Sequence, residues 1–341
     1  MRKSYGGYGR PVHTSKRKKS SVASSVAMVA ACILVFIAGV VLGKLPQLTQ
    51  RGGNAAESSS GFVSSEGQTQ DNSQKWESLS LVKPEGEQQL EGLSTIPLEE
   101  LNCTGYIVID RITGEVLLEK NMDGKTFPGS TTKILTAALS MEMGEDRNTQ
   151  MEVSSYALSI LSGDATTMGL KRGELMSYQD LMYGMMLPSA CDAANVIAEN
   201  ASGGDYNGFV RSMNDKAKEI GCTGTYFVNP SGLYSSSHFS TVADLARIEA
   251  YADQKEWYRQ IVSTQKYSLG ATNIHTQEGW NIIENSNQLL GSDSVFSSTG
   301  NIIEIEGSKT GTTIQGGYSM VGTAVTKDGV ELIAVVSGIP Y

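Results

Sequence analysis

The chain contains one uncharged, mainly apolar stretch that is long enough to cross a membrane. Residues 22–42 include no Asp, Glu, Lys or Arg, and the segment would be apolar on all sides of a helix. About 20 apolar residues span the hydrocarbon core of a bilayer. We therefore expect a single transmembrane helix at 22–42. No clear small-residue cleavage site follows it, which favours an uncleaved anchor over a signal peptide.

The charges are distributed unevenly around this segment. Residues 1–20 hold seven Lys or Arg and no Asp or Glu, whereas the remaining 20 basic and 36 acidic residues leave a charge of about −16. Basic residues that flank a membrane segment stay in the cytoplasm. We therefore expect a basic cytoplasmic tail at 1–21, the lipid bilayer as the partner of 22–42, and a cell-membrane protein whose bulk is extracytoplasmic. The acidic remainder argues against nucleic acid as a partner.

A polar segment follows the expected anchor. From Glu57 to Gln89 it is rich in Ser, Gly, Gln and Glu and has few large apolar residues. Such a composition buries too little apolar surface to offset the entropy lost on ordering. We expect 43–97 to be a flexible polar tether and 98–341 to be one folded domain.

Several chemistries are disfavoured by patterns that the sequence lacks. It has three histidines, of which His13 is in the basic tail, and no His-Glu-x-x-His, so no catalytic metal is expected. The Gly-x-Ser-x-Gly and Gly-x-x-x-x-Gly-Lys-[Ser/Thr] patterns are also absent, which argues against an α/β-hydrolase and a nucleotide triphosphatase. No cofactor is expected.

Cys103, Cys191 and Cys222 show no Cys-x-x-Cys spacing. A Cys103–Cys222 disulfide remains an alternative, but free thiols are favoured.

What remains is a serine paired with a lysine in the pattern Ser-x-x-Lys. On a helix these side chains lie one turn apart on the same face, and a lysine of lowered pKa can act as base for a serine nucleophile. This pattern occurs four times in the sequence. The first copy is in the basic tail, and the second precedes a proline, which disfavours a helix. The fourth is in an alternating segment, 261–269, that predicts a strand. The copies are Ser15/Lys18, Ser80/Lys83, Ser130/Lys133 and Ser263/Lys266.

Only the third copy has a suitable setting. Residues 106–110 and 115–119 predict two strands joined by a hairpin turn, a Pro-Gly pair then breaks the chain, and Ser130 begins a helical run. The free N–H groups and the dipole at a helix N-terminus favour a developing oxyanion. The same field disfavours a protonated Lys133, and burial with a second cation nearby would lower its pKa further.

Two further motifs accompany this pair. Lys-Thr-Gly at 309–311 lies in a predicted strand, and 316–322 predicts its neighbouring strand. Ser-Ala-Cys at 189–191 lies at the end of an apolar helical stretch between the other two motifs. With these motifs in this order, the chain resembles the serine-type D-Ala-D-Ala carboxypeptidases, the low-molecular-weight penicillin-binding proteins. The resemblance extends over about residues 100–340.

The resemblance implies an α+β fold of the serine β-lactamase/transpeptidase type, with an antiparallel sheet flanked by helices and a mainly helical lobe from about 140 to 250. It implies removal of the terminal D-alanine of peptidoglycan stem peptides through an acyl-enzyme, which β-lactam antibiotics would trap. Backbone N–H groups of Ser130 and Thr312 would form the oxyanion hole. The implied site residues are the nucleophile Ser130, the general base Lys133, the proton relay Ser189, and the substrate-binding residues Cys191, Lys309, Thr310, Gly311 and Thr312.

Several of the residues singled out in the sequence also have a purely structural interpretation. Ser189 fits a helix N-cap, and the Lys-Thr-Gly triplet fits a solvated strand end. His238 is expected to be a loop residue with a satisfied hydrogen bond rather than a catalyst. The order and spacing of the three motifs favour the catalytic interpretation.

Two features depart from the family pattern. Cys191 stands where the family has Asn, and a thiol is a poorer donor and acceptor than an amide. This keeps open a catalytically weakened peptidoglycan-binding or scaffold protein, whereas a β-lactamase is disfavoured because no Glu-x-x-Leu-Asn segment supplies a separate base. The sequence also stops just after an apparent strand at 330–336, where the family usually continues into a helix. We expect either that this helix is absent or that the sequence is truncated.

Overall fold

The computed structural model describes residues 79–82, 101–277, 280–287, 289–290, 302–326 and 329–340. The expected basic tail, the expected anchor at 22–42 and most of the expected tether lie outside these residues. Among the helices that are described, none combines the length and the apolar character needed to cross a membrane.

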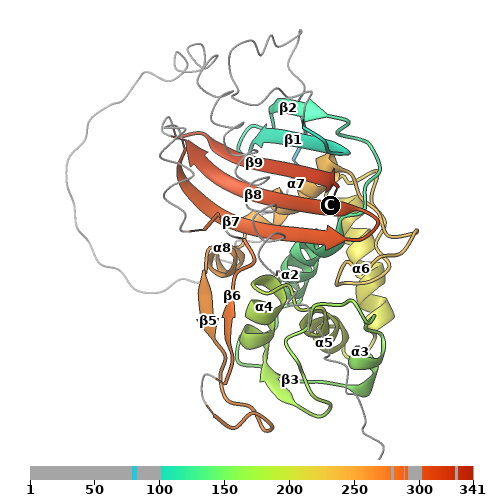
Figure 1. Cartoon of the computed structure of the whole chain (residues 1–341), viewed down its shortest axis with the longest axis vertical. Coiled ribbons are helices and arrows are strands. Elements are labelled where there is room, and N and C mark those ends of the chain that lie inside the picture. Colours follow the sequence, from blue (N-terminus) through green and yellow to red (C-terminus); the bar gives the residue numbers. More distant parts are fainter. Residues whose placement is uncertain are drawn as a thin grey trace, which may run out of the picture.

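The centre of the fold is a five-stranded antiparallel sheet (Figure 1). The predicted hairpin forms one edge of the sheet, and the predicted strand pair at the Lys-Thr-Gly motif forms the other, so both predictions are confirmed. The last strand along the chain lies between them and pairs with both sides. In spatial order the strands are β2 (Val116–Lys120), β1 (Gly105–Asp110), β9 (Glu331–Ile339), β8 (Gly317–Thr326) and β7 (Ile302–Thr313).

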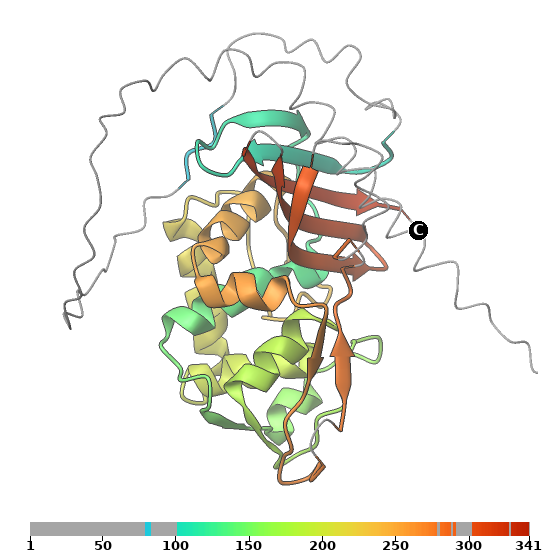
Figure 2. The same ribbon diagram turned by 90° about the vertical axis from the view of Figure 1, so that its left-hand side faces the viewer.

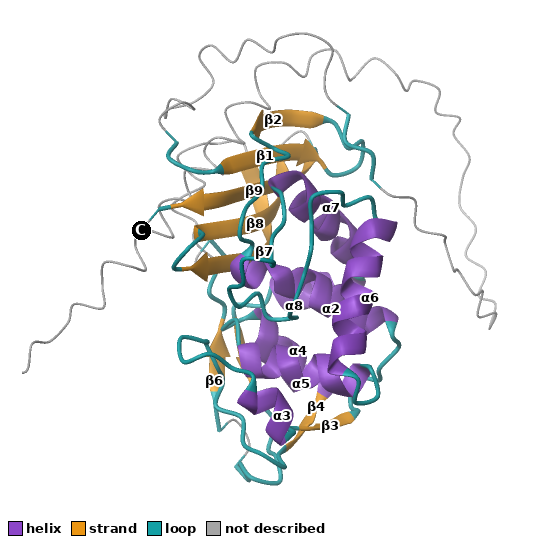
Figure 3. Ribbon diagram, turned by 90° about the vertical axis from the view of Figure 1, so that its right-hand side faces the viewer, coloured by secondary structure: helices purple, strands orange, loops and turns teal. Residues whose placement is uncertain are grey.

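Helices cover one face of the sheet and continue into a lobe beside it (Figures 2 and 3). α7 packs on the sheet, and α2 lies at the centre of the helical part, where it contacts α4, α5, α6 and α7. The expected helical lobe and α+β class are confirmed. The helices are α2 (Lys133–Glu142), α3 (Ser155–Ser159), α4 (Tyr178–Met186), α5 (Cys191–Ala201), α6 (Tyr206–Glu219), α7 (Val242–Asp253) and α8 (Glu256–Val262).

Local sequence explains where four of these helices begin. The side chains of Ser154, Ser177, Asp205 and Thr241 each accept a backbone N–H three residues further on. An oxygen at this position satisfies one of the N–H groups that the first helical turn leaves without a partner. These caps fix the starts of α3, α4, α6 and α7.

Two short hairpins complete the fold. β3 (Gln150–Glu152) pairs with β4 (Leu175–Ser177), and β5 (Lys266–Ser268) pairs with β6 (Ile282–Glu284). The strand predicted over 261–269 is therefore wrong in its first half, which belongs to α8 and the turn after it.

The reason for this error is the pattern of buried residues in α8. Tyr258, Ile261 and Val262 are all buried. Their spacing of three and four residues places them on one face of a helix. The apolar residues at the start of the alternating segment therefore belong to a helical pattern that begins before it.

The sheet buries apolar side chains on both faces. Ile107 and Ile109 of β1 belong to the large core shared with the helices, whereas Tyr106 and Val108 belong to a second, smaller core. Successive side chains of a strand point to opposite faces, so alternation in β1 supplies both cores.

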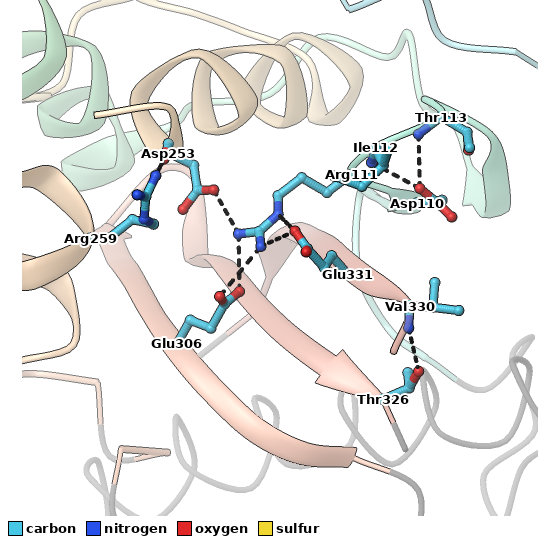
Figure 4. Close-up of polar contacts among 10 residues, drawn as sticks. All are labelled: Asp110, Arg111, Ile112, Thr113, Asp253, Arg259, Glu306, Thr326, Val330 and Glu331. Atoms are coloured by element: carbon cyan, nitrogen blue, oxygen red, sulfur yellow. Dashed lines mark hydrogen bonds and ion pairs between the residues drawn. The ribbon is translucent and has the colours of Figure 1, made fainter. Parts of the chain in front are cut away.

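One arginine joins the end of the sheet to α7 (Figure 4). Arg111 follows β1, and its Nη1 lies 2.6 Å from Asp253 Oδ2 and 3.0 Å from Glu306 Oε2. Its Nε lies 2.8 Å from Glu331 Oε2. Burial raises the pKa of Asp253, and the positive charges of Arg111 and Arg259 oppose that shift. The guanidinium thus holds three carboxylates from α7, β7 and β9 around one point.

Candidate active site

Ser130 lies in a tight turn directly before α2. This turn is a 3-10 helix, η3 (Gly129–Thr132), and α2 begins at Lys133. The prediction that Ser130 begins a helical run is confirmed, with the refinement that the first turn is 3-10 rather than α and follows a left-handed Gly129, with φ of 56°. Ser130 and Lys133 nevertheless face each other, with 3.0 Å between Oγ and Nζ.

Lys133 is completely buried and makes three polar contacts. In addition to Ser130 Oγ, its Nζ lies 2.6 Å from the carbonyl oxygen of Ser231 and 3.4 Å from Cys191 Sγ. Burial lowers the pKa of Lys133, and Cys191 and Asp192 partly oppose that shift. A lysine held beside a hydroxyl with a lowered pKa is suited to act as its base.

The segment before α5 brings Cys191, but not the Ser189 hydroxyl, into this network. Cys191 is the first residue of α5 and is buried. Ser189 adopts a left-handed conformation with φ of 69°, and its buried Oγ has no hydrogen-bond partner in the described part of the chain. The N-cap interpretation of Ser189 is wrong, because the N-cap residue is Ala190.

Asp192 is a structural residue of the site that the sequence analysis did not single out. Its buried carboxylate accepts hydrogen bonds from the backbone N–H groups of Met168, Gly169 and Leu170, at 3.1–3.2 Å. The carboxylate therefore fixes this loop against the start of α5. Asp192 directly follows the Ser-Ala-Cys motif, and this position in the sequence could have identified it as a residue of the site.

β7 brings the Lys-Thr-Gly motif alongside the Ser130 turn. Lys309 is almost fully buried, and its Nζ donates to the carbonyl oxygen of Thr310 at 3.1 Å. Burial lowers the pKa of Lys309 well below its ordinary value, and the charge of Lys133 lowers it further. A Cβ on Gly311 would lie 2.6 Å from the carbonyl oxygen of Pro128, so glycine allows the strand to approach the turn.

A loop at 229–233 supplies a third side of the site. Asn229 Oδ1 accepts hydrogen bonds from the backbone N–H groups of Ser231, Gly232 and Leu233. The loop is thereby shaped to place the carbonyl oxygen of Ser231 against Lys133. The Asn-Pro-Ser-Gly sequence indicates a turn here, but the contact with Lys133 could not be read from it.

Thr310 is also fixed by a residue that the sequence analysis missed. Its Oγ1 lies 2.7 Å from Ser286 Oγ, and the backbone N–H of Ser286 donates to the carbonyl oxygen of Leu187 at 2.9 Å. Ser286 thus links β7 to the segment that precedes the Ser-Ala-Cys motif.

His238 is a buried structural residue. Its Nδ1 accepts the backbone N–H of Val228, and its Nε2 lies 2.9 Å from Thr132 Oγ1. Burial and the charge of Lys133 lower the pKa of His238 to about 3. The expectation of a hydrogen-bonded loop histidine is confirmed, and the ring is neutral at physiological pH.

A pocket opens beside Ser130. Three of the predicted site residues, Ser130, Cys191 and Thr312, line it, whereas Lys133 and Lys309 are buried. The remaining lining residues are Asp164, Ala165, Thr166, Ser231, Gly232, Leu233, Tyr234, Thr313, Ile314 and Gln315. In the described residues Cys103, Cys191 and Cys222 are free thiols, and no group of three or more His, Cys, Asp or Glu is arranged to hold a metal ion.

The chain is similar to known proteins over the region that contains this site. Residues 93–340 match the family described as D-alanyl-D-alanine carboxypeptidase, peptidase S11. The D-alanyl-D-alanine carboxypeptidase DacA of Haemophilus influenzae is 30% identical over 247 residues, which cover 71% of this chain and 58% of that protein. The corresponding carboxypeptidase of Streptomyces sp. strain K15 is 28% identical over 237 residues, which cover 65% of this chain and 80% of that protein.

Solved structures show the same similarity. The crystal structure of the Streptomyces K15 DD-transpeptidase superposes with a TM-score of 0.63 at 26% sequence identity, covering 71% of this chain and 91% of that one. Penicillin-binding protein 5 from Haemophilus influenzae superposes with a TM-score of 0.61 at 27% identity, covering 72% and 68%. The chain has the α+β transpeptidase-like fold and belongs to the D-alanyl-D-alanine carboxypeptidase family of serine peptidases, family S11.

Proposed function

We propose that the chain is an active serine D-alanyl-D-alanine carboxypeptidase that removes the terminal D-alanine of peptidoglycan stem peptides. The observation that carries this proposal is the distance of 3.0 Å between Lys133 Nζ and Ser130 Oγ, in a site where burial lowers the pKa of the lysine. A neutral amine has two N–H groups and one lone pair. Ser231 O and Cys191 Sγ would accept the two N–H groups, which leaves the lone pair for the Ser130 hydroxyl proton.

The reaction follows from this arrangement. Lys133 takes the Ser130 proton while Oγ attacks the carbonyl carbon of the penultimate D-alanine, and the N–H groups of Ser130 and Thr312 stabilise the oxyanion. The peptide bond breaks, the proton taken up by Lys133 passes to the leaving D-alanine amine, and a water then hydrolyses the acyl-enzyme. For Ser189 to relay this proton, its hydroxyl would have to turn toward the network, because Ser189 Oγ has no hydrogen-bond partner among the described residues. Lys309 and Thr310 would hold the terminal carboxylate. A β-lactam would form the same ester with Ser130.

Release of D-alanine from diacetyl-Lys-D-Ala-D-Ala tests this proposal. The full chain should release D-alanine, and Ser130→Ala should not. A second candidate, a weakened peptidoglycan-binding or scaffold protein, is favoured by the thiol at Cys191 and by Ser189 Oγ, which has no hydrogen-bond partner among the residues that the structure describes. Absence of D-alanine release from a folded wild-type protein, together with retention on purified peptidoglycan, would support that second function.

The membrane assignment is part of the proposal. We propose that 22–42 anchors the protein in the cell membrane, with 1–21 in the cytoplasm and the catalytic domain outside. Carbonate washing of membranes should leave the full chain in the membrane fraction and release a version that lacks 1–42.

The rate of acylation is expected to rise with pH. Lys133 must be neutral to act as base, and burial lowers its pKa below the ordinary lysine value of about 10.4. The neutral fraction grows as the pH rises through the lowered pKa, so the midpoint should lie below about 10.4. This midpoint is obtained from the second-order rate constant for labelling by a fluorescent penicillin. The rate constant is measured from pH 5 to 10 in steps of about 1 pH unit. A rate that falls over this whole range would contradict the role of Lys133.

Cys191→Asn is expected to accelerate acylation about fivefold. An amide oxygen accepts the Lys133 N–H more strongly than sulfur does, and the amide adds a donor for the substrate carbonyl. Labelling by fluorescent penicillin measures the change, and Cys103→Ser is the control, since Cys103 does not line the pocket. An unchanged rate would show that position 191 contributes little to catalysis in this chain.

A further inference from the structure

The loop at 229–233 is attached to α2 through two successive carbonyl oxygens. Thr136 Oγ1 donates to the carbonyl oxygen of Pro230 at 2.7 Å, and Lys133 Nζ donates to that of Ser231 at 2.6 Å. Residues three apart on a helix lie on the same face, so these two side chains fix the loop along one side of α2. Pro230 and Ser231 are both buried, and the contacts are therefore made away from solvent.

The side chain of Asn229 determines the shape of this loop. Its Oδ1 accepts the backbone N–H groups of Ser231, Gly232 and Leu233 at 3.2, 2.7 and 3.1 Å. Its Nδ2 donates to the carbonyl oxygen of Leu233 at 2.9 Å. The segment belongs to neither a helix nor a strand. One side-chain amide therefore supplies the hydrogen bonds that regular structure would otherwise provide.

The carbonyl of Ser231 affects Lys133 in both of its protonation states. In the neutral amine it accepts one of the two N–H groups, and Cys191 Sγ would accept the other, which directs the lone pair to Ser130. In the ammonium it accepts a charge-assisted hydrogen bond, which favours the charged form. Displacement of this carbonyl should therefore lower the pKa of Lys133 and leave its lone pair less well directed.

Four other titratable groups interact with Lys133, and all of them lie outside the loop. Two of them, at the start of α5, oppose the lowering of the lysine pKa by burial. The charge of Lys133 lowers the pKa values of the other two. They are Cys191 and Asp192 of α5, Lys309 of β7 and His238 of the loop before α7. Because Asn229 carries no charge, removing its side chain changes none of these charges directly.

We propose that Asn229 is a positioning residue for the general base and acts through the carbonyl oxygen of Ser231. Asn229 does not line the pocket beside Ser130, and its side-chain hydrogen bonds in the described part of the chain stay within the loop. The inference rests on the proposed function, because it concerns the base of the same reaction. Its signature is a displaced pH profile, which a residue that only stabilised the fold would leave in place.

The pH profile of acylation tests this role in the full-length protein. The second-order rate constant for labelling by a fluorescent penicillin is measured over the same pH range for the wild type and for Asn229→Ala. We expect the plateau of the variant to be about tenfold lower, because the lone pair is less well directed. We expect its midpoint to lie about one pH unit lower, because the ammonium loses a hydrogen bond.

Asn214→Ala is the matched control. Asn214 is a buried residue of α6 whose Oδ1 accepts the backbone N–H of Phe227 and whose Nδ2 donates to the carbonyl oxygen of Phe227, both at 2.8 Å. It holds the segment directly before the loop by the same kind of contact, but none of these bonds reaches 229–233. This variant should lose thermal stability and keep the wild-type midpoint.

Asn229→Asp separates the shape of the loop from its charge. The carboxylate can accept the same three backbone N–H groups, so the plateau should stay within about threefold of the wild type. Its negative charge favours the ammonium of Lys133, so the midpoint should move up, opposite to the shift in Asn229→Ala. This variant carries the test alone if Asn229→Ala does not fold, because a plateau about tenfold lower would contradict the role of the Asn229 acceptor.

The remaining outcomes distinguish the two proposals. A wild-type midpoint in a folded Asn229→Ala protein, or an equal downward shift in Asn214→Ala, would overturn the positioning role and leave the acylation of Ser130 established. A wild-type protein that is not labelled at any pH would overturn the proposed function and this inference together.

Discussion

Replacing Lys133 by methionine is expected to lower the rate of acylation of Ser130 by about 10³-fold. General-base catalysis contributes roughly 10²–10⁴-fold to such reactions. Lys133 Nζ is the group positioned to accept the Ser130 proton, at 3.0 Å from Oγ. Methionine keeps an unbranched side chain in this buried position but has no basic nitrogen. The rate constant for labelling by a fluorescent penicillin at pH 8 measures the loss.

The fold is expected to survive this substitution. A completely buried lysine carries a desolvation cost, so an apolar side chain of similar size is tolerated there. Lys216→Met is the matched control, because Lys216 is a largely buried lysine on α6 that pairs with Glu142 and Glu219. The control should label at the wild-type rate. A folded Lys133→Met protein that also labels at the wild-type rate would exclude Lys133 as the base.

Replacing Arg111 by methionine is expected to lower the free energy of unfolding by about 3 kcal/mol. Removing one partner of a buried ion pair typically costs about 3–5 kcal/mol, because the remaining charge is left without compensation. Here the guanidinium holds Asp253, Glu306 and Glu331 (Figure 4), and we take the lower end of the range because Glu331 is 36% exposed. Urea unfolding at pH 7 measures the change.

The pH dependence of this loss separates an electrostatic effect from lost packing. Without Arg111, repulsion between the three carboxylates raises their pKa values above those of the unfolded chain. A raised carboxylate pKa means that the folded state gains stability as the pH falls and protons bind. The variant should therefore recover part of its loss at about pH 4, and a loss independent of pH would indicate lost packing instead.

Arg211→Met provides the control for Arg111. Arg211 forms an ion pair with Asp205 in which the two side chains are 67% and 58% exposed. Exposed pairs contribute about 0–1 kcal/mol, so this change should have little effect on the urea midpoint. A similar loss in both variants would show that burial of the Arg111 cluster is not what makes it stabilising.

Local patterns allowed much of the fold to be predicted. The hairpin at 106–119 and the strand pair at the Lys-Thr-Gly motif were predicted from alternation and turn residues, and both are present. The helix that carries Lys133 followed from its apolar spacing and from the Pro-Gly break before it. These features depend on residues that are close in sequence, which is why the sequence alone shows them.

The details of the site depend on contacts between distant segments. Ser231 is 98 residues from Lys133, and Ser286 is 24 residues from Thr310, so neither partner could be inferred from spacing. Ser189 lies in the connection between α4 and α5 and has a left-handed conformation, which a serine rarely adopts and which its residue type does not predict. The residue types of the site and the Ser130–Lys133 pair were therefore predictable, whereas the partners from distant segments were not.

Formation of a covalent ester at Ser130 can be tested by intact-protein mass spectrometry with benzylpenicillin. Opening of a β-lactam ring expels no fragment, so the wild-type chain should gain the whole mass of one benzylpenicillin, with the adduct on the peptide that contains Ser130. Ser130→Ala should gain nothing under the same conditions. An unmodified wild-type chain that is shown to be folded, or an adduct that persists in Ser130→Ala, would contradict the role of Ser130 as the nucleophile.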